Sequence, residues 1–126
     1  MSEGTDLTIV TWGASVFECI KALDNLPEDQ SVELIDLRTI NPIDIETIAA
    51  SVEKTGRCVI VQEAPKTCSM ASEISALVQE RCFLNLKAPV QRVCGFDVIM
   101  PYAKLELDYL PDAKRVAEAV GQTLAY

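Results

Sequence analysis

The chain of 126 residues contains no histidine. Without an imidazole, the polypeptide cannot by itself supply Ser-His or Cys-His nucleophile activation, histidine acid–base catalysis or a histidine metal ligand. A catalytic site in this chain would have to use carboxylates, lysine, backbone dipoles or groups from another chain. The sequence therefore offers no candidate catalytic residue and no candidate metal ligand.

Glycine-rich phosphate-binding motifs are also missing. The chain has 5 glycines, and neither G-x-G-x-x-G nor G-x-x-x-x-G-K-[ST] occurs in it. The turn after the first apolar run, TWGAS, holds only Gly13. A flavodoxin-like receiver needs acids at the tip of its first strand, whereas Asp6 stands at the beginning. We expect this domain alone to bind no cofactor.

Long apolar runs are absent, since none approaches the roughly 18 residues that span a bilayer. The start, MSEGTDL, does not resemble a signal peptide, and we expect no membrane contact. The 5 cysteines make an odd number without a Cys-x-x-Cys pair, which indicates reduced thiols used as small apolar side chains. They are Cys19, Cys58, Cys68, Cys82 and Cys94.

The net charge is −8 and the isoelectric point is near 4.4. This balance argues against nucleic-acid binding, because phosphates are neutralised by clustered lysine and arginine. It suits a basic protein partner, although an acidic surface is also ordinary for a protein of the cytosol or of an organelle.

Short β-branched apolar runs alternate with segments of helical periodicity. The runs at 7–12, 32–37, 58–61 and 91–95 predict strands. Strands that alternate with helices predict right-handed crossovers and a parallel sheet. We therefore predict a single α/β domain over residues 1–126, a three-layer αβα sandwich with a mainly parallel sheet.

Several residues are typical of helix starts. Ser15 and Glu18 form a Ser-x-x-Glu pattern, which predicts a capping box. Ser69 or Ser72 is expected to cap the third helix. Pro111 suits the first turn of the last helix.

The stretch from Cys58 to Glu80 has a strand–turn–helix pattern that can present a nucleophile. Cys68 or Ser69 would need a nearby base, but Glu63 is a lone carboxylate with no imidazole to relay a proton. We interpret the stretch as a connection, with Ser69 as a helix cap and Cys68 as a partly exposed thiol.

Two other places suggest contacts with other chains or domains. Asp36 and Arg38 stand on one side of an extended segment, where they either pair with each other or anchor a neighbouring domain. Residues 96–110 show no clean period and predict a long surface loop that exposes Tyr102, Lys104 and Tyr109. Aromatic residues on such a loop are typical of an interface.

Several segments together resemble one family. They are DLTIVTWG, IDLRTINPID, EAP followed by SEISALVQERCFLNLKAPVQRVCGFD, and MPYAKLE followed by LPD. From about Gly4 to Tyr126, the chain is similar to the C-terminal domain of the β subunit of thiamine-diphosphate-dependent 2-oxo acid dehydrogenases, a domain of the transketolase C-terminal type. SEISALVQERCFLNL and RVCGFD look most like the branched-chain (2-oxoisovalerate) enzyme, which we favour. MPYAKLE is closer to pyruvate dehydrogenase β subunits.

The resemblance implies a division of labour. In the family, the α subunit holds the diphosphate and Mg²⁺, and the N-terminal domain of the β subunit holds the aminopyrimidine. The C-terminal domain supplies contacts with the α subunit and the second β subunit (α2β2) and part of the docking surface for the peripheral subunit-binding domain of the acyltransferase core. That binding domain is basic, which gives the acidic charge a role. The interface candidates are Asp36, Arg38, Glu63, Tyr102, Lys104 and Tyr126, whose terminal carboxylate matches the family's docking position.

The family's enzyme decarboxylates a 2-oxo acid oxidatively, and this chemistry belongs to the cofactor. We expect the isolated domain to be inactive, and the resemblance implies a mitochondrial matrix or bacterial cytoplasmic location. Two alternatives stay open: a free-standing, non-catalytic binding or regulatory module of the same fold, and the C-terminal domain of a pyruvate dehydrogenase β subunit or of a transketolase.

The sequence departs from the family at three places. Gln62 stands where many branched-chain members carry histidine, and Cys68 and Ser69 replace two glycines. Lys87 replaces an acidic residue that is linked to core docking in relatives. Either docking differs here, or Tyr126 and its neighbours carry it.

In the family, an antiparallel edge strand precedes GTDLTIVTWG. Here residues 1–3 come before it, and we interpret them as start residues rather than as that strand. The remaining four strands would lie in the order 2-1-3-4, with the second as a bare edge. A bare edge invites pairing between chains, so we predict self-association along Val32–Leu37.

Overall fold

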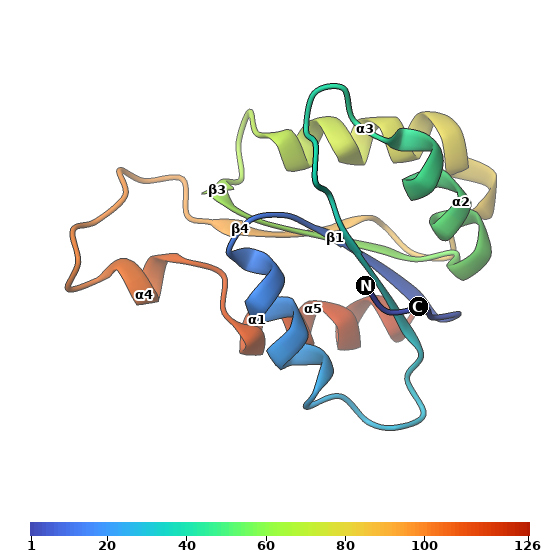
Figure 1. The fold of residues 1–126 in the computed structure, drawn as a ribbon, viewed down its shortest axis with the longest axis horizontal. Helices are drawn as coiled ribbons and strands as arrows, with labels where there is room; N and C mark the ends of the chain where they lie inside the picture. The colour runs from blue at the N-terminus through green and yellow to red at the C-terminus, as the bar shows by residue number, and fades with distance from the viewer.

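The computed structural model describes residues 1–126 as one four-stranded parallel sheet between two layers of helices (Figure 1). The strands lie in the order β2-β1-β3-β4, which confirms the predicted fold class and order. The strands are β1 (Leu7–Thr11), β2 (Val32–Asp36), β3 (Cys58–Pro65) and β4 (Gln91–Gly95). The helices are α1 (Ser15–Leu23), α2 (Ile45–Thr55), α3 (Met70–Cys82), α4 (Glu106–Tyr109) and α5 (Ala113–Leu124), and a 3-10 turn spans Phe83–Asn85.

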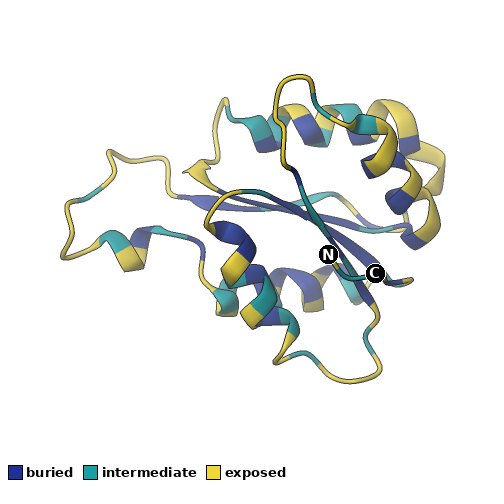
Figure 2. Cartoon of the chain, in the orientation of Figure 1, coloured by how far each residue is buried: buried dark blue, intermediate teal, exposed yellow.

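The core has two halves, one on each face of the sheet. Helices α1 and α5 cover one face and α2 and α3 cover the other (Figure 1). Along β1, Ile9 packs in the α1/α5 cluster and Val10 packs in the α2/α3 cluster. The central strands are therefore buried on both sides (Figure 2), which explains why their sequences are continuous apolar runs without alternation.

The free edge of β2 is less bare than predicted. Ser2 forms an isolated antiparallel bridge with Leu34, whose backbone N–H donates to the Ser2 carbonyl at 3.1 Å. Gly4 lies directly against the β2 backbone, because a Cβ there would be 2.3 Å from the Glu33 nitrogen. One residue of antiparallel pairing thus covers part of the edge. Self-association along this strand stays a prediction.

At two of the predicted helix starts, the residue expected to begin or cap the helix does not do so. Helix α1 does begin at Ser15, but no side chain caps it. Instead of closing a capping box, the Glu18 carboxylate accepts a hydrogen bond from the Ala113 N–H at 3.1 Å and pairs with Lys21. Pro111 precedes the last helix, whose N-cap is Asp112, because the Asp112 carboxylate can satisfy an exposed helix N–H and a proline cannot.

The connection between β3 and α3 is held by a buried glutamine. The Gln62 side-chain amide donates to the carbonyls of Ala64 and Pro65, and its oxygen accepts from the Ala71 N–H at 2.9 Å. Ser69 is the N-cap residue as predicted, but its hydroxyl donates to a carbonyl in the preceding turn and not to the helix. Gln62 therefore takes over the capping that was expected from serine.

The loop prediction for residues 96–110 is partly wrong. The segment contains the single-turn helix α4, and Tyr109 within it is buried. Tyr109 was expected to be exposed, but its ring packs against Gly95 at the end of β4, where a Cβ would lie 2.6 Å from a ring carbon. Tyr102 is fully exposed, as expected.

Candidate functional site

The carboxyl ends of the four strands share one edge of the sheet, because all the pairings are parallel. From β1 the chain passes through α1 to β2 on one side, and then crosses through α2 to β3 on the other. The strand order thus reverses between β1 and β3. Ligands of open parallel sheets bind outside such a reversal point.

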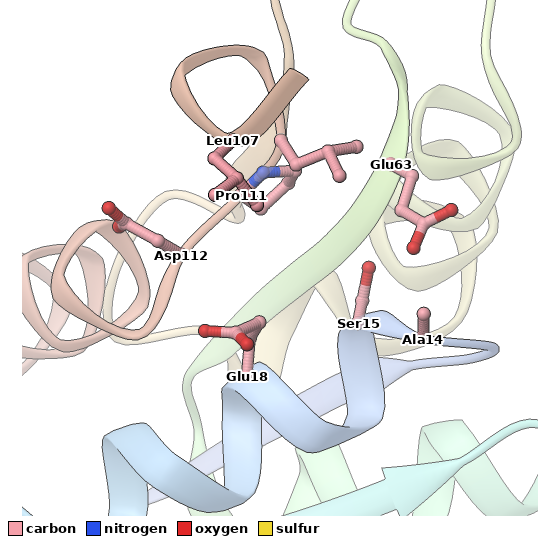
Figure 3. A pocket seen from close by; sticks show the side chains of 8 residues that line it. Ala14, Ser15, Glu18, Glu63, Leu107, Pro111 and Asp112 are labelled. Atoms are coloured by element: carbon pink, nitrogen blue, oxygen red, sulfur yellow. The ribbon is translucent and has the colours of Figure 1, made fainter. Parts of the chain in front are cut away.

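A pocket of about 310 Å³ lies at this point, between the start of α1, the end of β3 and the chain before α5 (Figure 3). We call it the carboxyl-edge pocket. The Ser15 hydroxyl is directed into the space between Glu63 and Pro111 (Figure 3). Its lining residues are Ala14, Ser15, Glu18, Glu63, Leu107, Leu110, Pro111 and Asp112.

The polar groups of the pocket are mostly acidic. The Asp112 carboxylate accepts from the Arg115 N–H at 2.8 Å, and the Glu18 carboxylate is shared between a backbone N–H and Lys21. Glu63 is exposed and has neither a hydrogen bond nor an ion pair through its carboxylate. Ser15 is only 2% exposed, and its hydroxyl has no hydrogen-bond partner.

Next to the pocket, residues 96–107 form an arm that extends away from the sheet (Figure 1), and Leu107 at its end also lines the pocket. Its base is fixed by Arg115, whose guanidinium lies over the Phe96 ring and donates to the carbonyls of Cys94, Tyr109 and Leu110. The exposed apolar side chains of the arm are Phe96, Val98, Ile99, Met100, Tyr102, Leu105 and Leu107. Exposed apolar side chains that gather on one segment are typical of an interaction surface.

The predicted interface residues do not form one site. Asp36 ends β2 and forms an ion pair of 2.9 Å with Arg38, whose side chain is 83% exposed. Tyr102 and Lys104 lie on the arm, and Glu63 lies in the carboxyl-edge pocket.

Tyr126 is separated from the other five. Helix α5 starts beside the end of β4 and runs back along the sheet, so the C-terminus lies toward the amino ends of the strands (Figure 1). The terminal carboxylate thus belongs to the opposite end of the domain. The predicted interface residues therefore lie at both ends of the domain.

Four of the five thiols are buried and one is exposed. Burial raises the pKa of Cys19 and of Cys58 to about 12, and it also raises the pKa of Cys82 and Cys94. Such thiols stay protonated near neutral pH and react slowly. Cys68 is exposed, and its backbone is left-handed with φ of 51°. A glycine at this position, as the resemblance describes, adopts that conformation without strain.

The pocket does not fit a diphosphate. Three residues with carboxylates line it and no glycine does, so a phosphate would meet electrostatic repulsion. The structure holds no group of three or more acidic, cysteine or histidine side chains that could bind a metal ion. No helix is both long enough and apolar enough to cross a membrane.

Sequence reasoning missed Arg115, which fixes the base of the arm, and Asp112, which caps α5 beside the pocket. Asp112 carries a readable signal, since an aspartate before a periodic segment is a common N-cap. For Arg115 no local signal exists, because its partners Phe96 and Cys94 lie about twenty residues earlier in the chain.

Comparison with known proteins identifies a family that is consistent with the observed fold. Residues 1–116 match the family described as "Transketolase, C-terminal domain". The chain is 50% identical over 129 aligned positions to the mitochondrial 2-oxoisovalerate dehydrogenase subunit beta of Dictyostelium discoideum, which covers 100% of the chain and 34% of that relative. It is 47% identical to the pyruvate dehydrogenase E1 component subunit beta of Bacillus subtilis, over 98% of the chain and 38% of that relative.

A solved structure described as a split gene transketolase, inactive beta4 tetramer, matches with a TM-score of 0.77. It is 28% identical and covers 98% of this chain and 40% of its own. The chain thus spans between a third and two fifths of the length of the proteins that it matches. The family match spans most of the chain, two relatives are about 50% identical to it, and the sheet has the strand order expected from the resemblance. The chain therefore belongs to the transketolase C-terminal domain family.

Proposed function

We propose that the chain is the C-terminal, assembly domain of the β subunit of a 2-oxo acid dehydrogenase. The proposal is supported by relatives of that description at 50% and 47% identity, which the chain covers by only 34% and 38% of their length. A solved transketolase relative is more distant, at 28% identity. The bond-making chemistry then belongs to the rest of the enzyme, and this domain alone turns over no substrate.

The observation that carries the assembly role is the exposed arm. Ile99 is 95% exposed and Tyr102 is 97% exposed, and leaving such apolar area in water is unfavourable by roughly 25 cal/mol per Å². An interface core enriched in aromatic and aliphatic side chains would remove that cost. We assign this surface to contacts with the α subunit and the second β subunit, with Tyr102 and Lys104 as contact residues. Arg38, which follows β2, is a further contact candidate.

A second surface is proposed to dock the acyltransferase core. Its candidate is the terminal carboxylate of Tyr126, at the opposite end of the domain from the arm. A basic binding domain would be steered toward a chain of net charge −8. Because the two surfaces lie apart, subunit assembly and docking would not compete for one face.

For the substrate we propose a branched-chain 2-oxo acid, supported by the 50% identity to a 2-oxoisovalerate dehydrogenase subunit. Pyruvate is the alternative, since a pyruvate dehydrogenase subunit follows at 47%. Thiamine diphosphate and Mg²⁺ would be held elsewhere in the enzyme, because the carboxyl-edge pocket does not fit a diphosphate. The two relatives predict a mitochondrial matrix or bacterial cytoplasmic location.

The test uses two matched substitutions of exposed apolar residues. Ile99→Asp lies on the arm, and Leu84→Asp lies on the 3-10 turn after α3, where Leu84 is 94% exposed. Co-purification with an α subunit and the N-terminal part of a β subunit is expected to fail with Ile99→Asp and to persist with Leu84→Asp. Equal retention of both variants would contradict the assembly role of the arm.

The docking surface has a separate test. Calorimetric titration with the acyltransferase's peripheral subunit-binding domain is expected to show binding that is lost on deletion of Tyr126. Ile99→Asp serves as the control and should leave this titration unchanged. Undiminished binding after the deletion would contradict the docking assignment while leaving the arm assignment intact.

A further inference from the structure

The carboxyl-edge pocket has a polar group that nothing in the chain satisfies. Ser15 is 2% exposed, and its hydroxyl has no hydrogen-bond partner although it faces the pocket (Figure 3). Leaving a buried hydroxyl unpaired has a free-energy cost. A ligand with an N–H donor would relieve this cost, because a serine oxygen accepts readily. The buried hydroxyl therefore indicates a ligand.

The charges around the pocket decide what kind of ligand fits. Glu63 is unpaired, and Glu18 is only partly neutralised by Lys21 at 2.6 Å. The starts of α1 and α5 each contribute roughly half a positive charge. Together they offset about one carboxylate, that of the α5 cap Asp112, and leave Glu63 unbalanced. The pocket therefore repels anions and attracts cations.

The walls set the shape of the ligand. Four apolar residues line the pocket: Ala14, Leu107, Leu110 and Pro111. They would pack against an aliphatic stem, as lysine and arginine stems pack on apolar surfaces elsewhere in proteins. The volume of about 310 Å³ lies at the lower limit for ligand pockets, so it suits a group the size of one side chain.

We propose that the carboxyl-edge pocket binds an organic cation, an ammonium or guanidinium group on a short aliphatic stem, with Glu63 as its counter-ion and the Ser15 hydroxyl as its acceptor. Such a group is present both on a small alkyl amine and on a lysine or arginine side chain of a partner. The proposal does not depend on the assembly role, since it rests on the pocket alone.

The test is an NMR titration of the chain with n-butylammonium and with n-butylguanidinium, and sodium butyrate serves as the anion of similar size. Saturable shifts at the backbone amides of Ser15 and Glu63 are expected with the two cations and not with butyrate. Shifts spread evenly over the acidic surface, or equal binding of butyrate, would overturn the proposal.

A matched pair of variants separates local binding from general charge. Glu63→Gln and Glu80→Gln each remove one exposed carboxylate, and only the first lies in the pocket. Glu63→Gln is expected to raise the apparent Kd of the cations about two- to fivefold, as for the loss of one partly screened ion pair. Glu80→Gln should leave it unchanged, and equal effects of the two variants would also overturn the proposal.

A third probe distinguishes the two sources of the cation. N-acetyl-lysine methylamide carries the same ammonium within a short piece of protein backbone. Tighter binding of this probe than of n-butylammonium supports capture of a partner's side chain. Weaker binding supports a free amine as the ligand.

Discussion

The guanidinium carbon of Arg115 lies 4.8 Å from the centroid of the Phe96 ring. The same ring meets Tyr109 edge-on, with centroids 6.4 Å apart and planes inclined by 68°. One cation thus links both ends of the segment that carries the arm. The apolar arm extends from the domain, but its base is fixed by packing and by hydrogen bonds to backbone carbonyls.

Arg115→Met should release the arm while keeping most of the apolar stem. The substitution removes a cation–π contact and the charged donors to three carbonyls, so we expect a loss of about 2 kcal/mol in unfolding free energy. Hydrogen exchange should speed up at residues 96–110 and stay slow in β1 and β3. Lys114→Met, at the exposed neighbouring position, is the control; equal effects would contradict the clamp role of Arg115.

Cys68→Gly should stabilise the domain by about 1 kcal/mol, because Cys68 has φ of 51° and a Cβ is disfavoured in the left-handed region. Ser69→Gly is the matched control. Ser69 has φ of −115°, so glycine there only adds freedom to the unfolded chain and should destabilise. Denaturant unfolding of both variants measures the two free energies, and a loss of stability in Cys68→Gly would refute the strain argument.

Gln62→Leu should destabilise by about 1–3 kcal/mol, because the leucine leaves the buried Ala71 N–H and two part-buried carbonyls without their partner. Exposed Gln79 on α3 gives the control Gln79→Leu, which should be nearly neutral. Thermal unfolding compares them. Nearly identical Tm values for the two variants would show that water or relaxation satisfies the start of α3.

The decrease in the free energy of unfolding at acid pH should depend in part on Asp97. Hydrogen bonds from the Thr67 N–H and hydroxyl lower the pKa of Asp97 below its ordinary value of 3.8. Because the folded-state pKa is the lower one, the ionised form stabilises the fold above the unfolded-state pKa, and this stabilisation is lost as pH falls through the folded-state value. The stability difference between wild type and Asp97→Asn should therefore shrink from pH 6 toward pH 2. A pH-independent difference would contradict this linkage.

Thiol labelling should distinguish Cys68 from the other cysteines. Cys68 is the only exposed thiol of the 5, and burial raises the pKa of the rest. A thiol reagent such as DTNB should therefore modify one group per native chain quickly and the remainder only after unfolding. The Cys68→Gly variant should show no fast phase, and a fast phase that persists would place the reactive thiol elsewhere.

The sequence by itself determined the layers of this domain. Buried strands covered on both faces need continuous apolar runs, and amphipathic helices need a 3.6-residue period. Both patterns are local, so the four strands were readable within a few residues at their ends. The strand order came from the family resemblance, and the structure has the same order.

Only the tertiary structure decided the polar and aromatic contacts that make the site. Glu18 fits a capping box locally, but its carboxylate accepts from Ala113, 95 residues away. Tyr109 stands in an aperiodic segment and is nevertheless buried against Gly95. A local sequence pattern reflects which residues are buried and how often they recur. The partner of a hydrogen bond or of an aromatic ring depends instead on which distant segments the folded chain brings together.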